Sequence, residues 1–573
     1  MMKQKRLLLF IAVILGIAAI CKAELISKNA KFFTSDLTKS EKKRAFKDLV
    51  RFESYENLNS EITGKYDKAH AVKCVNGTFV GTEEYGVASW LGIPYAKPPV
   101  GKRRFKAPEY VEASDRVFEA KYYGKGAFGS LGYDDCIQKQ MSEDCLYLNI
   151  WLNADDKTKK KPVMVWIHGG AYVVGSGSQA SYSGANLVQE HSDIIMVNIN
   201  YRLNMYGFMD FSSVPGGENF KTAPCNGLLD QAMALRWVHE NIAAFGGDPD
   251  NVTIFGESAG GSSCALLSLI EEAHKYFKRA IIQSGSPIMT RSREEAIAVT
   301  DKIMAALDCK TVADLQKVEP RKLADKVGEL FGIYQVLGWS IWPERDGKLL
   351  PEDGWKAYED GKAKDIALLL GCNKDEFNVF SAAFGAEKWN KWAADRMAKR
   401  AKLMTAEENA LVESYVNSAT GEDWEKTSAL FSQSYVNAPA SRMSETQTKA
   451  GGKVFTYLFT PEASTPGVKS GHAIEQSAVF NHPELSVQIA GRAFDEIFCK
   501  TIRKMWIQFA KTGNPSLTAE QSPDGTAKEW PLYDTGDKHV MVLDEFNIHP
   551  AKESDVKIVD WDKTYFLTKL YCN

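Results

Sequence analysis

The stretch Val252-Thr253-Ile254-Phe255-Gly256-Glu257-Ser258-Ala259-Gly260 indicates the fold class most directly. Residues 252–255 are a compact apolar run, which is typical of a strand buried on both faces of a sheet, and a helical pattern covers Gly260–Glu272. The glycine-flanked serine between them has the pattern of a nucleophile elbow, a tight turn that exposes a serine hydroxyl above a helix N-terminus. Gly-x-Ser-x-Gly is a weak pattern alone, but this strand–turn–helix setting favours Ser258 as a nucleophile over an ordinary turn residue.

Further apolar runs of similar length alternate with helical segments along the chain. The runs are Val163–Ile167, Ile194–Ile199, Ala280–Ile282, Ile366–Leu370 and the strand-like Val454–Phe459. Strands that alternate with helices indicate an α/β protein with a mostly parallel central sheet flanked by helices. We find no internal repeat, low-complexity tract or linker that divides the chain. We therefore predict one domain over residues 72–573.

A glycine-rich turn, His168-Gly169-Gly170-Ala171, follows the run at 163–167. Small residues in such a turn allow backbone N–H groups to face a ligand without steric obstruction. The tetrahedral intermediate of an ester carries an oxyanion that needs two or three such donors. A phosphate-binding loop is the alternative, but neither GxGxxG nor a GK[ST] ending is present.

A serine nucleophile needs a base, and the base needs an orienting carboxylate. In this kind of sheet the chain order is serine, then acid, then histidine. Among the histidines after Ser258, spacing favours His472, and His482 is its main alternative. Asp375 and Glu376 both follow an apolar run at a position suited to the acid, and the residue pattern does not choose between them.

The composition and the N-terminal residues indicate which partners and which cellular location to expect. The 573 residues carry a formal net charge of −3, so we expect neither nucleic acid nor an anionic membrane surface as a partner. A basic start followed by the 14-residue apolar run Leu7–Ile20 reads as a signal peptide over residues 1–23, because about 20 apolar residues are needed to cross a bilayer. We predict cleavage after Ala23 and export. We expect the polar residues 24–71 to form an extension packed on the body of the protein.

The chain resembles the type-B carboxylesterase and cholinesterase-like family from about residue 72 to its end. The landmarks that carry the resemblance are Leu91–Ala96, Ser142–Asn149, Asn200–Arg202, Gly227–Gln231, Phe245–Pro249, the elbow around Ser258, and Gly371–Glu376. The resemblance implies the α/β-hydrolase fold and a serine ester hydrolase that acts on small-molecule esters without a metal or cofactor. It leaves the natural ester and the oligomeric state open.

The resemblance also assigns roles that spacing left open. It selects Glu376 as the acid and His472 as the base of Ser258. It places the oxyanion donors on the N–H groups of Gly170, Ala171 and Ala259. Ala171 stands where many members have glycine. An alanine keeps its N–H donor, so we expect the oxyanion hole to survive unless that position requires positive φ.

Two further kinds of contact are implied by the same resemblance. One is a disulfide between Cys136 and Cys145. The other is a pair of buried ion pairs, which join Arg104 to Glu143 and Arg202 to Asp230. Cys309 has no cysteine in the region expected to hold its partner, so a second disulfide of the family is not expected.

Two departures from the family restrict the expected substrate. Only Ile137–Asp144 separate Cys136 from Cys145, and none is the tryptophan that binds choline in cholinesterases. The segment that matches the acyl pocket carries Ile288 and Met289. The chain therefore looks closer to general carboxylesterases, including bacterial ones. A lipase that acts at lipid interfaces is the alternative enzyme, and a non-catalytic adhesion protein is disfavoured because the three triad residues are all retained.

Overall fold

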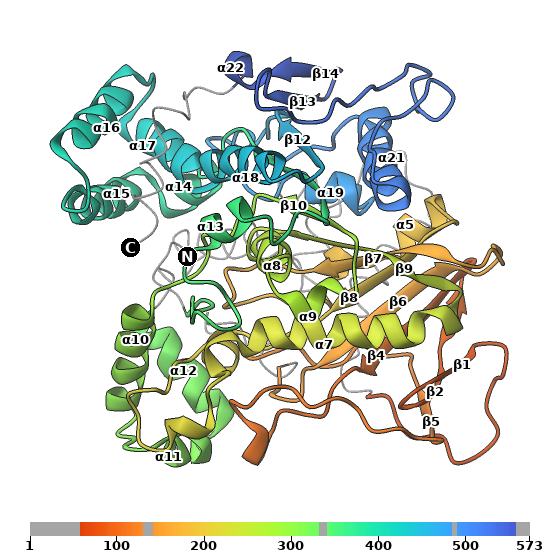
Figure 1. Ribbon diagram of the computed structural model, residues 1–573. Coiled ribbons are helices and arrows are strands. Elements are labelled where there is room, and N and C mark those ends of the chain that lie inside the picture. The colour runs from red at the N-terminus through yellow and green to blue at the C-terminus, as the bar shows by residue number, and fades with distance from the viewer. Residues whose placement is uncertain (1–57, 130–140, 332–340, 484–489, 557–573) are drawn as a thin grey trace. The chain divides into compact units, whose positions relative to one another are not determined.

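The computed structural model of the protein describes residues 58–129, 141–331, 341–483 and 490–556 (Figure 1). The described chain forms two compact units. We call residues 58–278 with 289–353 the N-terminal unit, and residues 279–288 with 354–556 the C-terminal unit. The single domain predicted over residues 72–573 stays a prediction.

The N-terminal unit is built on a mixed sheet. Its strands lie in the order β9 (Gly247–Glu257), β7 (Lys161–Ile167), β8 (Ile195–Ile199), β6 (Tyr147–Asn153), β4 (Val87–Pro94) and β3 (Thr82–Glu84). Strand β7 is parallel to both β8 and β9, whereas β6, β4 and β3 pair antiparallel toward the edge. A separate small sheet joins β1 (Ala71–Cys74), β2 (Gly77–Val80) and β5 (Val117–Glu119).

The described residues of the C-terminal unit form five further strands. They lie in the order β10 (Arg279–Gln283), β11 (Ala367–Asn373), β12 (Val454–Phe459), β13 (His539–Asp544) and β14 (Asn547–Lys552). Strands β10 to β13 run parallel to one another, and β14 pairs antiparallel with β13. Every apolar run that the sequence analysis interpreted as a strand is a strand in the structure. The reason is that each run is buried on both faces.

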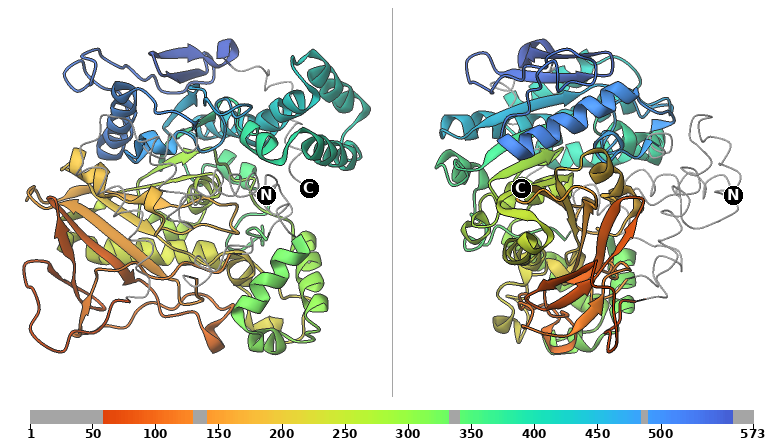
Figure 2. Two further views of the ribbon diagram at one scale, coloured as in Figure 1. Left: turned by 180° about the vertical axis from the view of Figure 1, so that it is seen from behind. Right: turned by 90° about the vertical axis from the view of Figure 1, so that its right-hand side faces the viewer.

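Helices surround these strands within each unit. Those of the N-terminal unit are α5 (Ala185–Glu190), α6 (Asn204–Gly207), α7 (Asn226–Asn241), α8 (Ala259–Leu267), α9 (Glu271–His274), α10 (Arg293–Ala306), α11 (Val312–Lys317) and α12 (Pro320–Phe331). Those of the C-terminal unit are α13 (Gly354–Glu359), α14 (Asn378–Phe384), α15 (Ala386–Ala401), α16 (Ala406–Ser418), α17 (Asp423–Ser432), α18 (Ala438–Lys449), α19 (Gln476–Val479), α21 (Glu496–Thr512) and α22 (Glu553–Val556). Helices α14 to α17 pack together as one group, drawn in teal in Figures 1 and 2.

The two buried ion pairs are confirmed inside the N-terminal unit. Arg104 binds Glu143 through two hydrogen bonds of 2.5 and 2.6 Å. Arg202 binds Asp230 in the same two-pronged manner, at 2.8 and 2.7 Å. A guanidinium that meets a carboxylate in this fork geometry satisfies both charges, which makes burial of the pair tolerable.

The end of the predicted extension is attached to the N-terminal unit through Asn59. Its side chain donates to the carbonyls of Leu91 and Tyr122, each at 2.8 Å, and accepts from the N–H groups of Lys121 and Tyr122. The N–H of Ile62 adds a bond to the carbonyl of Val117. Asn59 and Ile62 thus contact the body of this unit, and residues 24–57 lie outside the described residues, so the extension over residues 24–71 stays a prediction.

Candidate active site

Ser258 occupies a strained turn between β9, which ends at Glu257, and α8, which begins at Ala259. Its φ and ψ are 58° and −121°, a conformation that L-residues rarely adopt outside functional turns. A Cβ atom on Gly260 would lie 2.0 Å from the carbonyl oxygen of Ile167, and one on Gly256 would lie 2.6 Å from the same oxygen. Only glycine at these two positions allows the turn to pack this closely against the end of β7. The local structure is that of a nucleophile elbow.

The predicted oxyanion loop follows β7 and lies against the elbow. A Cβ atom on Gly169 would be 3.2 Å from the Cβ of Ser258. Gly170 and Ala171 have φ of +106° and +55°. The position of Ala171 therefore does require positive φ, and the alanine adopts it at some cost in strain.

In this loop the backbone carbonyls are hydrogen-bonded within the protein, whereas two backbone N–H groups have no partner among the described residues. Its carbonyls are engaged: that of Gly170 accepts from the N–H of Val173 at 3.0 Å, and that of Ala171 accepts from Nε1 of Trp342 at 3.2 Å. In the part of the chain that the structure describes, the N–H groups of Gly170 and Ala171 have no acceptor. The N–H of Ala259 opens α8, where no helical carbonyl precedes it. Unpaired donors beside the serine suit a ligand that carries negative charge.

The predicted base and acid meet in the C-terminal unit. Oε2 of Glu376 lies 2.5 Å from Nδ1 of His472, and the N–H of His472 donates to the carbonyl of Glu376 at 3.1 Å. Glu376 comes just after β11 and is fully buried. Its other oxygen accepts from the hydroxyl of Ser284 at 2.6 Å and from the N–H of Asn373 at 2.7 Å. These donors keep the carboxylate turned toward the imidazole.

Asp375 and His482, the alternative acid and base, do not take part in this contact. The carboxylate of Asp375 accepts from the N–H of Ser470 at 3.3 Å, and the N–H of Asp375 donates to the carbonyl of the same serine. Burial raises the pKa of Asp375. Asp375 is thus a local contact of the loop that carries His472. Of the two histidines, His472 and not His482 reaches Glu376.

A second buried carboxylate, Glu475, lies in the same loop as His472. Its two oxygens accept from Nε2 of Gln283 at 3.0 Å and from Nδ2 of Asn373 at 2.7 Å. Burial, followed by the charge of Glu376, raises the pKa of Glu475. No role was predicted for Ser284, Gln283 or Asn373, although Asn373 lies inside the landmark Gly371–Glu376. All three stand at or just beyond the ends of β10 and β11.

The predicted residues thus form two groups. Ser258, Gly170, Ala171 and Ala259 lie together in the N-terminal unit, while Glu376 and His472 lie together in the C-terminal unit. The predicted disulfide is not observed. Cys145 is a buried free thiol, and Cys136 lies outside the described residues.

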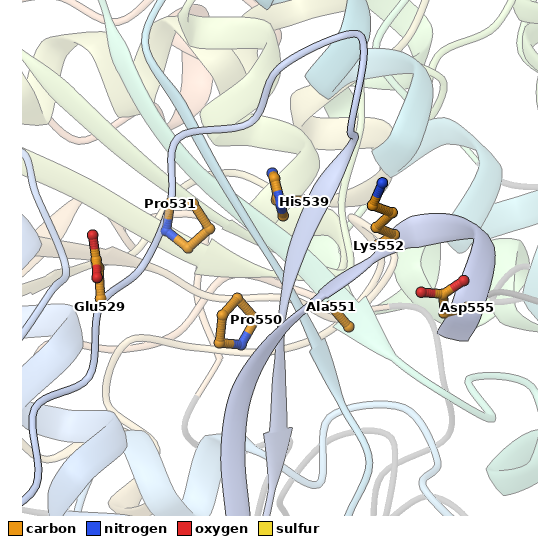
Figure 3. Close-up of a pocket in the computed structure, with 7 residues that line it drawn as sticks. All are labelled: Glu529, Pro531, His539, Pro550, Ala551, Lys552 and Asp555. Carbon is orange, nitrogen blue, oxygen red and sulfur yellow. The ribbon is translucent and has the colours of Figure 1, made fainter.

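The C-terminal unit also has a surface pocket of about 430 Å³, shown in Figure 3. It is lined by Glu529, Pro531, His539, Pro550, Ala551, Lys552 and Asp555. Lys552 pairs with Asp537 at 2.8 Å, and His539 pairs with Asp534 at 3.3 Å, so these charges have local partners. Among the described residues, no serine or cysteine lines this pocket.

The sequence model of the carboxylesterase family matches residues 68–557. The chain belongs to the carboxylesterase family. It is 36% identical to para-nitrobenzyl esterase of Bacillus subtilis (strain 168), over 84% of this chain and 96% of that protein. Its identity to acetylcholinesterase of Danio rerio is 31%, over 81% of this chain and 82% of the relative. The predicted resemblance is therefore confirmed.

A solved structure supports the same assignment. Carboxylesterase EST55 of Geobacillus stearothermophilus superposes with a TM-score of 0.74 at 33% identity, covering 85% of this chain and 99% of that one. The protein is a carboxylesterase with the α/β-hydrolase fold, as predicted. No helix among the described residues is both long and apolar enough to cross a membrane.

Proposed function

We propose that Ser258, His472 and Glu376 form a catalytic triad that hydrolyses small carboxylic esters through an acyl-enzyme. The observation that carries the proposal is the 2.5 Å contact between Oε2 of Glu376 and Nδ1 of His472. An imidazole that donates its Nδ1 proton to a carboxylate has its Nε2 lone pair available as a base. A strained serine with unpaired backbone donors beside it supplies the other half of such a site.

In the proposed reaction, Ser258 Oγ attacks the ester carbonyl while Nε2 of His472 takes the hydroxyl proton. The negative charge on the carbonyl oxygen is stabilised by the N–H groups of Gly170, Ala171 and Ala259. The imidazolium then gives its proton to the leaving alcohol. A water molecule, activated by the same histidine, hydrolyses the acyl-serine. Buried Glu376 stabilises the imidazolium in both steps.

An active-site-directed phosphonate ester tests this assignment. We expect it to label Ser258 alone, because this serine has the elbow and the adjacent donors. Intact mass should rise by one phosphonyl group, and peptide mapping should place it on the peptide that contains Ser258. Ser258→Ala should be folded, unlabelled and inactive. Labelling that persists in this variant would refute the assignment.

We also propose that the protein is exported by the signal peptide predicted over residues 1–23. The support is the basic start and the short apolar run Leu7–Ile20. N-terminal sequencing of the mature protein should begin at Glu24. Recovery of the full-length chain in the cytoplasm would contradict export.

A further inference from the structure

The oxyanion loop of the N-terminal unit is held from behind by a tryptophan. Nε1 of Trp342 donates a hydrogen bond of 3.2 Å to the carbonyl of Ala171. The indole is 5% exposed, so water offers this carbonyl little replacement for the bond. Ala171 combines a left-handed φ with an N–H that has no acceptor among the described residues. Its carbonyl and its N–H are attached to the same strained Cα.

The chain beside Trp342 is fixed to a neighbouring segment. The N–H of Arg291 donates to the carbonyl of Pro343 at 3.0 Å, and the N–H of Arg345 donates to the carbonyl of Arg291 at 3.1 Å. The side chain of Arg291 is buried and donates through Nη2 to the carbonyl of Phe208 at 2.6 Å. The backbone that follows Trp342 is therefore held by hydrogen bonds to Arg291.

We propose that Trp342 is a positioning residue for the oxyanion hole, an inference that rests on the function proposed above. An alanine in the left-handed region gains free energy by relaxing toward negative φ. Such relaxation rotates the N–H of Ala171 relative to its carbonyl. The hydrogen bond from Trp342 holds the carbonyl in place, so the N–H stays directed at the position of the oxyanion. Trp342 itself need not touch the substrate.

Trp342→Phe tests the proposal because it removes the N–H donor and keeps an aromatic ring. We expect kcat to fall about fivefold, which corresponds to the loss of one neutral hydrogen bond, with KM changed by less than about twofold. Trp90→Phe is the matched control. Trp90 belongs to the same unit, is also 5% exposed, and donates through Nε1 to the carbonyl of His70 at 2.9 Å. It should keep the wild-type kcat.

A matched pair of 4-nitrophenyl substrates, an ester and its thionoester, distinguishes a misplaced oxyanion donor from a general loss of enzyme structure. The sulfur of a thionoester accepts hydrogen bonds weakly, so its hydrolysis gains less from oxyanion donors. Trp342→Phe should therefore lower the ester rate more than the thionoester rate, and the ratio of the two should fall severalfold. In Trp90→Phe this ratio should not change.

The outcomes distinguish this inference from the proposed triad. If Ser258→Ala is inactive while Trp342→Phe keeps the wild-type kcat and rate ratio, the positioning role is wrong and the triad stands. If Ser258→Ala is active, the triad itself is wrong. Should Trp342→Phe fail to fold, benzothienylalanine at position 342 replaces the indole N–H by sulfur with nearly the same shape. The same fall in the rate ratio is expected from it, and an unchanged ratio overturns the proposal.

Discussion

Oε2 of Glu376 lies 2.5 Å from Nδ1 of His472, although 96 positions separate the two residues in the chain. The neighbouring Asp375 instead contacts the backbone of Ser470. Adjacent side chains in this loop thus point to different partners. The imidazole is oriented by one carboxylate, and this difference makes the roles of the two acids separable by experiment.

Glu376→Gln should lower kcat by about three to four orders of magnitude, since loss of the orienting acid costs about 10⁴ in the serine-protease example. Asp375→Asn should lower it less than about tenfold, as expected for a charge outside the triad. Steady-state kinetics with one neutral ester measures both. Thermal melting must be run in parallel, because Glu376 is fully buried and also accepts bonds from Ser284 and Asn373. A crippled Asp375→Asn beside a nearly normal Glu376→Gln would show that the acid is misassigned.

Much of this site could be predicted from the sequence because strands buried on both faces are nearly continuous apolar runs. The tight turn at Ser258 and the glycine-rich loop after β7 then follow directly from glycines placed next to such runs. The acid could not be chosen this way, since Asp375 and Glu376 are equivalent in pattern. The resemblance to a family supplied the choice, and the observed contact agrees with it.

Other features of the site depend on contacts between residues far apart in the chain, which a local sequence pattern does not predict. Ser284 reaches Glu376 across 92 positions, and Trp342 reaches Ala171 across 171 positions. Nothing in the residue type of Ala171 indicates positive φ, because alanine disfavours it. Its conformation is imposed by the packing of the loop and by its hydrogen bonds.

The stability and activity of Ala171 variants should reflect the positive φ of this residue. Ala171→Gly removes the steric strain but adds backbone entropy to the unfolded chain, so we expect the free energy of unfolding to change by no more than about 1 kcal/mol. Its activity should stay near that of the wild type. Ala171→Val places a β-branched residue in the left-handed region and should lower kcat by at least about tenfold, since a single oxyanion donor is worth about 10²–10³. Equal activity of the two variants would argue against a donor role for this residue.

The stability of the N-terminal unit should depend on pH through Glu344. Burial and the neighbouring carboxyl of Asp210 raise the pKa of Glu344 to about 8, despite the opposing charges of Arg291 and Arg293. The folded protein therefore holds a proton that the unfolded chain has lost above its ordinary pKa of 4.5. Stability from this group is present below pH 4.5 and is lost as the pH rises to about 8.

The melting temperature between pH 6 and pH 9 tests this expectation. The wild type should melt at a lower temperature at pH 9, and Glu344→Gln, which cannot ionise, should lose much of that difference. Glu352→Gln is the control, since Glu352 is exposed in the same unit. A Glu344→Gln variant with the full wild-type pH dependence would exclude Glu344 as its source.

Substrate preference should favour uncharged esters with short to medium acyl chains over acetylcholine. The basis is the absence of tryptophan from residues 137–144 and the aliphatic Ile288 in the segment that matches the acyl pocket. The preference is measured as kcat/KM for a neutral ester divided by kcat/KM for acetylcholine, with the two substrates of similar size. A higher value for acetylcholine would contradict this reading.

The attachment of Asn59 limits how far the chain can be shortened from its N-terminal side. Four backbone groups of the N-terminal unit bond to this single side chain, and a chain shortened past it would leave them exposed to water. A variant shortened past Asn59 should therefore melt at a lower temperature than one that keeps this residue, which makes Asn59 a practical landmark for preparing the enzyme.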